Sequence, residues 1–209
     1  DTLTPVGIDT FNNLLKNLNK AIKGVFGGVL KGKDFADTVK NKAGVEISTI
    51  DGIVYGFVGN DGKIYLNGEH INANTPIHEY GHVWINMIKS ARKDIYDKGL
   101  ELISKTGYVD KVRKNPAYKG LTKTQILEEA LAMAIGDRGQ FIVGAAPKAK
   151  FNEWITEFWE SIKGFFKGKI TDLSPDQVSK LSVVEFLDLV AGQLVAGESV
   201  NNALVGGEV

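Results

Sequence analysis

The sequence predicts an α+β protein with a small antiparallel sheet, a helix that carries a His-Glu-x-x-His motif, and a mainly helical C-terminal part. Three observations support this fold class. Strand-like runs on each side of the turn-forming Asn60-Asp61-Gly62 are typical of a hairpin. The motif His78-Glu79-Tyr80-Gly81-His82 follows directly on a helix start signal. From residue 92 onward, apolar residues recur at helical spacing.

The bulk composition is that of an ordinary globular domain. Of the 209 residues, 43% are hydrophobic and 24% are charged, which is enough for one sizeable domain or one domain with a helical extension. The formal net charge is zero, so no global positive field predicts nucleic-acid binding. The chain has no cysteine, which excludes disulfides, thiolate metal sites and cysteine nucleophiles. It also lacks a run of 18 apolar residues, so we expect no contact with a membrane.

The chain begins at Asp1, without an initiating methionine or a signal-like apolar stretch. We therefore expect it to be part of a longer polypeptide. Together with the missing cysteines, this favours an intracellular setting such as the cytoplasm of a bacterial host, or a virion, without deciding between them.

The charges are unevenly distributed along the chain. Residues 89–123 contain ten Lys/Arg and four Asp/Glu, a local charge of +6, whereas residues 171–209 contain six Asp/Glu and one Lys, a local charge of −5. Two solvated or mutually complementary faces would explain this pattern, and so would a binding patch.

Several short elements are expected before the motif. Apolar spacing predicts helices over 11–22 and 35–41, and a short apolar run predicts a strand over 25–30. The hairpin strands are expected over 53–58 and 63–67. The motif then lies on a helix, because Thr75 is a good N-cap and Pro76 suits the first helical turn.

The remainder of the chain is expected to be helical. The pattern predicts helices over 95–107, 108–114, 125–135, 151–166 and 183–194. Either Gly136 or Gly139 is expected to end the third of these. We assign residues 1–140 to the motif-bearing domain and residues 141–209 to a helical extension packed on the same domain.

The motif has the chemistry of a zinc hydrolase. Residues four apart on a helix share one face, so His78 and His82 can bind one metal ion together. Glu79 projects beside them, within reach of the water that a zinc ion activates. A non-functional pair of histidines on a helix is the alternative explanation.

A catalytic zinc also needs a third protein ligand and an open position. No cysteine is available, no histidine follows the motif, and His70 lies in a loop upstream. A carboxylate on a later helix is therefore expected. Glu128 and Glu129 begin a run of small residues that would let their helix pack closely on the motif helix, and periodicity alone does not choose between them.

Residues 64–67, 74–84 and 129–137 resemble the zincin-type metallopeptidase domains embedded in large polyvalent proteins of phages and mobile elements of gut bacteria. The resemblance covers about residues 50–140. It implies a zincin-like fold and a gluzincin-type zinc site of His78, His82 and Glu129, since a glutamate followed three residues later by alanine is the third ligand in such domains.

The resulting functional hypothesis is a zinc-dependent endopeptidase that cleaves a peptide or protein substrate, with Glu79 as general base. A non-catalytic zinc-binding or structural module of a larger phage-type polyprotein is the alternative, and hydrolysis of a non-peptide amide is a further one. An oxyanion donor is also needed, for which Tyr108, Tyr118 and Arg138 are candidates.

Substrate binding is expected at residues 63–66. If this strand lies at the edge of the sheet, then Ile64, Tyr65 and Leu66 would pair with an extended peptide. An edge strand that its neighbours merely protect is an equally good explanation of the same pattern.

Overall fold

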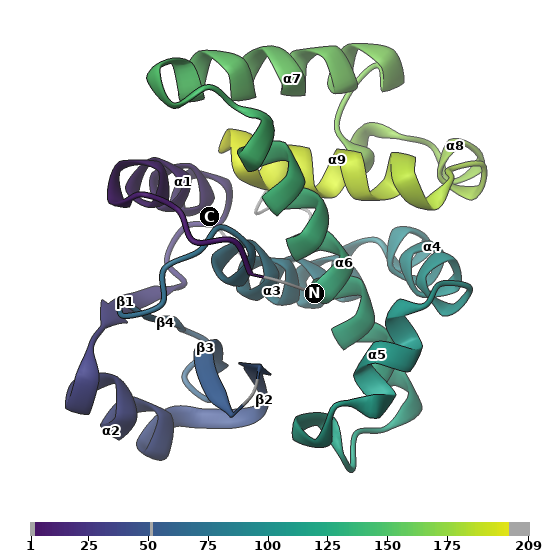
Figure 1. Cartoon of the computed structure of the whole chain (residues 1–209). Helices are drawn as coiled ribbons and strands as arrows, with labels where there is room; N and C mark the ends of the chain where they lie inside the picture. Colours follow the sequence, from purple (N-terminus) through teal and green to yellow (C-terminus); the bar gives the residue numbers. More distant parts are fainter. Residues whose placement is uncertain (1–2, 51, 201–209) are drawn as a thin grey trace.

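In the computed structural model of the protein, residues 3–50 and 52–200 are described, apart from the side chains of residues 44–49 (Figure 1). The fold is α+β, as the sequence predicts. Its elements are α1 (Ile8–Ala21), β1 (Phe26–Leu30), α2 (Gly32–Lys42), β2 (Ala43–Ile50), β3 (Ile53–Gly59), β4 (Ile64–Asn67), α3 (Asn74–Ala91), α4 (Lys93–Ser104), α5 (Tyr108–Lys114), η1 (Pro116–Tyr118), α6 (Lys123–Ala145), η2 (Lys148–Lys150), α7 (Phe151–Phe166), η3 (Ile170–Asp172), α8 (Pro175–Ser179) and α9 (Val183–Ala196).

The strands form one mixed sheet in the order β1-β4-β3-β2. β3 and β4 make the antiparallel hairpin that the turn sequence predicts, and β2 pairs antiparallel with β3. β1, in contrast, lies parallel to β4. The expected all-antiparallel sheet is therefore wrong. A tight turn enforces antiparallel pairing, but a strand connected through a helix and two further strands can align in either direction.

β4 is an interior strand of this sheet. It pairs with β1 along one edge and with β3 along the other. Its residues Ile64, Tyr65 and Leu66 are buried. The prediction that these three residues bind an extended substrate is therefore wrong, because neither edge of β4 is free. The sequence pattern gave no sign that β1, 34 or more residues upstream, would occupy the second edge.

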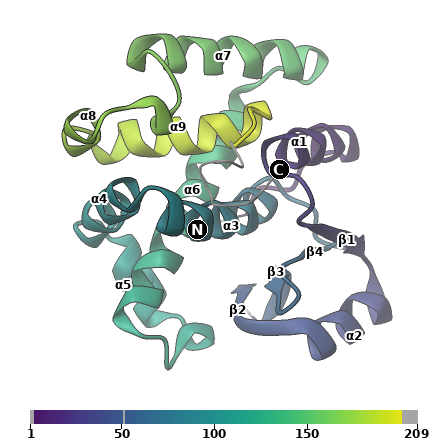
Figure 2. The same cartoon turned by 180° about the vertical axis from the view of Figure 1, so that it is seen from behind.

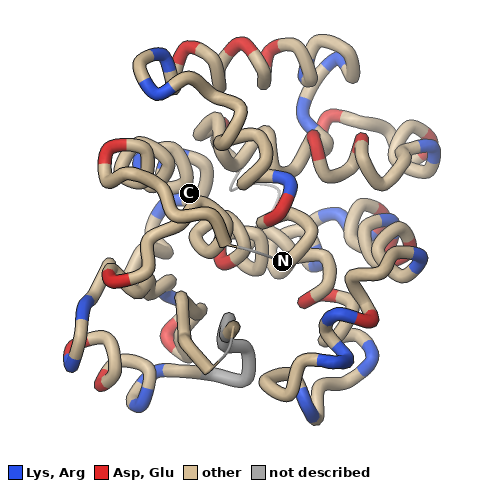
Figure 3. Tube along the Cα trace, viewed as in Figure 1, with Lys and Arg blue, Asp and Glu red and all other residues tan. Residues whose placement is uncertain are grey.

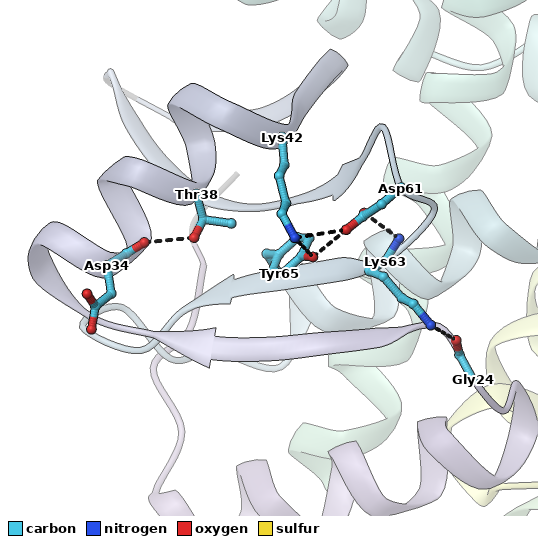
Figure 4. A network of polar contacts seen from close by, with 7 residues as sticks. All are labelled: Gly24, Asp34, Thr38, Lys42, Asp61, Lys63 and Tyr65. Carbon is cyan, nitrogen blue, oxygen red and sulfur yellow. Dashed lines mark hydrogen bonds and ion pairs between the residues drawn. The ribbon is translucent and has the colours of Figure 1, made fainter.

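α2 packs against the sheet through a small separate cluster of Phe35, Phe57 and Tyr65. A polar network beside this cluster ties α2 to the β3–β4 turn (Figure 4). The Tyr65 hydroxyl donates to Asp61 Oδ2 at 2.5 Å, and Lys42 Nζ lies 3.2 Å from the same oxygen. The hydrogen bond from Tyr65 is the main reason why the pKa of Asp61 falls to about 2.

The motif helix α3 is capped differently from the prediction. At the start of α3, the side chain that accepts a hydrogen bond from a free backbone N–H is that of Asn72 and not that of Thr75. Asn72 Oδ1 accepts this bond from the Thr75 backbone N–H at 2.7 Å. Thr75 is buried, and its methyl group packs on β3 where Gly56 has no side chain. A Cβ at Gly56 would lie 2.8 Å from that methyl carbon. Pro76 stands in the first turn but is not the first residue of the helix, as Thr75 capping would require, because α3 begins at Asn74.

α6 continues to Ala145, so the prediction that Gly136 or Gly139 ends it is wrong. Both glycines face α3 instead. A Cβ at Gly136 would lie 2.7 Å from Asn74 Oδ1, and a Cβ at Gly139 would lie 2.6 Å from two carbon atoms of Ile77. A glycine inside a helix costs about 1 kcal/mol relative to alanine. Here it allows the two helix backbones to approach closely.

α3 lies at the centre of the fold, between the sheet and the other helices (Figures 1 and 2). It contacts α1, α4, α6, α9, β3 and β4, and α9 also contacts α1, α6 and α7. One large hydrophobic core connects these elements, with members on both sides of residue 140 such as Ile77 and Leu189. The expected domain boundary at residue 140 falls inside α6. Among the described residues, no helix is long and apolar enough to span a membrane.

Candidate metal centre

Three side chains converge where α3 crosses α6. His78 and His82 lie one turn apart on α3, and their Nε2 atoms are 3.1 Å apart. Glu129 reaches them from α6, with Oε1 at 2.9 Å from His78 Nε2 and Oε2 at 2.7 Å from His82 Nε2. All three side chains are buried. The structure thus brings together the three residues that the resemblance implies as a ligand set.

The close approach of α3 and α6 makes this convergence possible. A Cβ at Gly136 would lie 3.1 Å from the Cβ of His78, which is tighter than ordinary van der Waals contact. On the other helix, a Cβ at Gly81 would lie 3.3 Å from Ile135 Cγ2. Because glycines stand on both helices, the short carboxylate arm of Glu129 can reach the imidazoles directly.

The structure also separates the two adjacent glutamates. Glu128 accepts a hydrogen bond from the Tyr96 hydroxyl at 2.5 Å and pairs with Lys89 Nζ at 3.1 Å. It therefore ties α6 to α4 and to the end of α3. Of the two glutamates, Glu129 faces the histidines. Periodicity could not choose between Glu128 and Glu129, because the choice depends on how α6 is rotated about its axis against α3 and α4.

The electrostatics of the cluster favour a positive charge at its centre. Both carboxylate oxygens of Glu129 are buried, and each lies against one imidazole nitrogen, Oε1 against His78 Nε2 and Oε2 against His82 Nε2. Burial alone would raise the pKa of Glu129, but the imidazoles of His82 and His78 outweigh it and hold that pKa well below its usual value. Burial would likewise lower the pKa of His78, yet the Glu129 charge raises it overall. An ionised carboxylate and two converging imidazoles suit a shared cation.

The residues fit a zinc ion. With ligand bonds of about 2.0–2.1 Å in tetrahedral geometry, neighbouring ligand atoms lie about 3.3 Å apart. The observed separations of 2.7–3.1 Å are about 0.2–0.6 Å shorter than that distance. Two imidazoles and one carboxylate form a ligand set suited to zinc that leaves a fourth position for water. Among residues 3–50 and 52–200, the one group of three potential ligands close enough to hold a metal ion is His78, His82 and Glu129.

Glu79 completes the candidate site. It follows His78 directly on α3 and is almost fully buried, with 1% of its surface exposed. Its charge contributes to the raised pKa of His78, which places the carboxylate within electrostatic reach of the cluster. A buried carboxylate beside two imidazoles can accept and return a proton during hydrolysis.

Arg138, one of the predicted oxyanion donors, is not near this cluster. It pairs with Asp188 on α9, and its guanidinium lies over the ring of Phe141. Residues nine apart on a helix are half a turn out of phase, so Arg138 stands on the opposite side of α6 from Glu129. The prediction for Arg138 is therefore wrong.

The other candidates have different surroundings. The Tyr108 hydroxyl donates to Asp137 Oδ2 at 2.7 Å, and burial raises the pKa of Tyr108 above its usual value. Tyr118 is buried in η1, and its role as an oxyanion donor stays a prediction. His70 is exposed in its loop, where its ring packs edge-on against Tyr55. It does not belong to the metal-binding group found among the described residues.

Two residues near the site escaped the sequence analysis. Asn74, one turn before His78, donates its side-chain amide to Asp137 Oδ1 at 2.7 Å. Asp137 therefore joins the start of α3, the start of α5 and the middle of α6. Both residues lie within the segments that carry the resemblance, but neither was given a role there, although the spacing of Asn74 before His78 places the two on one helix face.

No protein-family model matches this chain, and no match was found among curated proteins or among solved structures. The function proposed below is therefore argued from the residues and geometry of the site.

Proposed function

We propose that this protein is a zinc-dependent endopeptidase, in which His78, His82 and Glu129 bind zinc and Glu79 is the general base. The observation that supports the proposal most strongly is the convergence of three ligand atoms from α3 and α6, with the Glu79 carboxylate beside them. A structural zinc has no use for a carboxylate base at this position.

The protein groups have distinct parts in the proposed reaction. Bound zinc supplies Lewis acidity, which acidifies a water molecule and polarises the scissile carbonyl. Glu79 accepts the proton of the attacking water on its carboxylate and delivers that proton to the leaving amine. Because Glu79 and the two histidines share α3, one rigid element positions the base relative to the ligands.

Metal analysis combined with a cleavage assay tests this proposal. We expect one zinc per chain in the wild type and in Glu79→Gln, with cleavage of a denatured protein or a mixed peptide library only in the wild type. The carboxamide keeps the size of the side chain but cannot take the proton. Absence of zinc at this site, or equal cleavage by both proteins, would refute the proposal.

The glutamate pair offers a matched control for the ligand assignment. Glu129→Gln should weaken zinc binding by more than the roughly 10- to 100-fold that loss of an outer-shell partner costs. Glu128→Gln should leave zinc affinity within a few-fold of the wild type, because Glu128 faces Tyr96 and Lys89. The opposite ranking would contradict the assignment of Glu129.

A non-catalytic metal module is the second candidate function, and the burial of the site favours it. Glu79 and Glu129 are each 1% exposed, and the two histidines are 5–6% exposed. If no substrate reaches the metal, its fourth position will be closed. Cobalt substitution distinguishes the two candidates: a small hydroxamate should change the visible spectrum of an open catalytic site and leave that of a closed structural site unchanged.

A further inference from the structure

The segment 105–123 joins α4 to α6 and contains α5 and η1; we call it the basic arm. It carries six Lys/Arg and one Asp, a net charge of +5 in 19 residues, whereas the whole chain is neutral. Figure 3 shows several blue segments close together on this arm. The positive charge expected from the sequence for residues 89–123 is therefore concentrated on one structural unit.

Most of this charge is not neutralised within the described part of the chain. Lys114, Lys119 and Lys123 are exposed, and among the described residues none of them forms an ion pair or hydrogen bond. Among the residues that the structure describes, Arg113 pairs only with Asp110, at 4.0 Å on the exposed surface. An exposed pair of that length contributes almost nothing.

Helix stability does not account for the placement of all these cations. Lys114 ends α5, where a positive charge complements the helix dipole. Lys123, however, lies in the first turn of α6, where the same dipole disfavours a cation. The cost is small, a few tenths of a kcal/mol. The position of Lys123 is therefore not explained by the stability of α6.

The basic arm lies beside the candidate metal centre. α5 packs on α6, and the bond from Tyr108 to Asp137 fixes its first turn there. Lys123 precedes Glu129 by six residues on the same helix, which is about 9 Å along the axis. η1 contacts β2, and α5 stands opposite the sheet in Figures 1 and 2.

We propose that the basic arm binds an acidic segment of the polypeptide substrate and thereby selects Asp/Glu-rich sequences for the candidate peptidase site. This inference rests on the proposed function, because it assigns that site its substrate class. A carboxylate-rich peptide complements unpaired ammonium groups in charge and gains affinity mainly through long-range attraction. A single-stranded nucleic acid fits less well, because bases stack on exposed aromatic rings, whereas Tyr118 is buried and Tyr108 is half-buried with Lys111 Nζ over its ring.

Binding of a fluorescein-labelled decaglutamate peptide to the Glu79→Gln protein tests the proposal without requiring cleavage. Anisotropy at low ionic strength should show saturable binding that weakens as salt is added. The triple variant K114E/K119E/K123E should bind at least about tenfold more weakly. The matched control K16E/K20E/K23E reverses three exposed lysines, two on α1 and one directly after it, at equal cost in net charge, and should stay within about twofold of the parent.

Three binding results would refute the proposal that the basic arm binds acidic peptides. These are no binding of decaglutamate, an equal loss of decaglutamate affinity in both triple variants, and tighter binding of a single-stranded oligonucleotide of equal charge. None of them bears on catalysis, because the peptidase proposal is judged separately by cleavage of an unbiased peptide library. If the wild type cleaves that library without preference for acidic sequences, the basic arm proposal fails and the peptidase proposal stands.

Discussion

Replacing Gly136 with alanine should separate α3 from α6 and loosen the candidate metal centre. The added Cβ would lie 2.7 Å from Asn74 Oδ1, 3.1 Å from His78 Cβ and 3.3 Å from the Asn74 carbonyl oxygen. Overpacking of this kind costs about 1–3 kcal/mol. The better helix propensity of alanine returns about 1 kcal/mol. Displacing Asn74 would also weaken its hydrogen bond to Asp137, which is worth about 1 kcal/mol.

We therefore expect Gly136→Ala to lower the free energy of unfolding by about 1–3 kcal/mol. Zinc affinity should fall by about 10- to 100-fold, as it does when a group that positions a ligand is disturbed. Denaturant unfolding of the metal-free protein and competition with a chelator measure the two effects.

Gly144→Ala on the same helix is the matched control. No heavy atom lies within 4 Å of a Cβ at Gly144, so this variant should be more stable than the wild type by about 0.5–1 kcal/mol and should bind zinc unchanged. If Gly136→Ala is as stable as Gly144→Ala and binds zinc equally well, close helix packing does not position His78.

Three further predictions concern polar contacts outside the ligand set. Because the hydrogen bond from Tyr65 lowers the pKa of Asp61 from 3.8 to about 2, ionised Asp61 should stabilise the fold above about pH 4, and this contribution should be lost as the pH falls through about 2. The Asp61 side chain is 31% exposed, so screening limits its effect to about 1 kcal/mol, and an Asp61→Ala variant equally destabilised at pH 7 and at pH 2 would contradict this. Tyr108→Phe removes one of the two bonds to Asp137 and should lower the free energy of unfolding by about 1–2 kcal/mol, measured by urea denaturation. Glu128→Ala should lower the free energy of unfolding by about 1–3 kcal/mol, because it leaves the hydroxyl of the buried Tyr96 unpaired; an unchanged urea midpoint would count against that bond.

Local sequence accounts for the features whose partners lie nearby in the chain. The hairpin β3–β4 follows from the chemistry of Asn60-Asp61-Gly62, and the position of the motif on a helix follows from Pro76 and the apolar spacing around it. The shared face of His78 and His82 follows from helix geometry alone.

The role of Gly136 and Gly139 could not be predicted from local sequence. A glycine near the end of a helical pattern is as consistent with a helix stop as with close packing. Gly136 and Gly139 turned out to serve packing, because α3 occupies the space beside them. The residues of α3 that these glycines contact, Asn74, Ile77 and His78, lie far away in the sequence, so no local pattern could distinguish the two uses.

By itself, the sequence determined an α+β chain with a hairpin, a motif helix and two candidate glutamates downstream. Only the tertiary structure decided that Glu129 rather than Glu128 meets the histidines, that β1 covers the second edge of β4, and that the charges of residues 105–123 stand beside the site. The physical reason is one of range. Backbone geometry and turn chemistry act over a few residues, whereas the rotation of α6 and the order of the strands are set by packing between segments far apart in the chain.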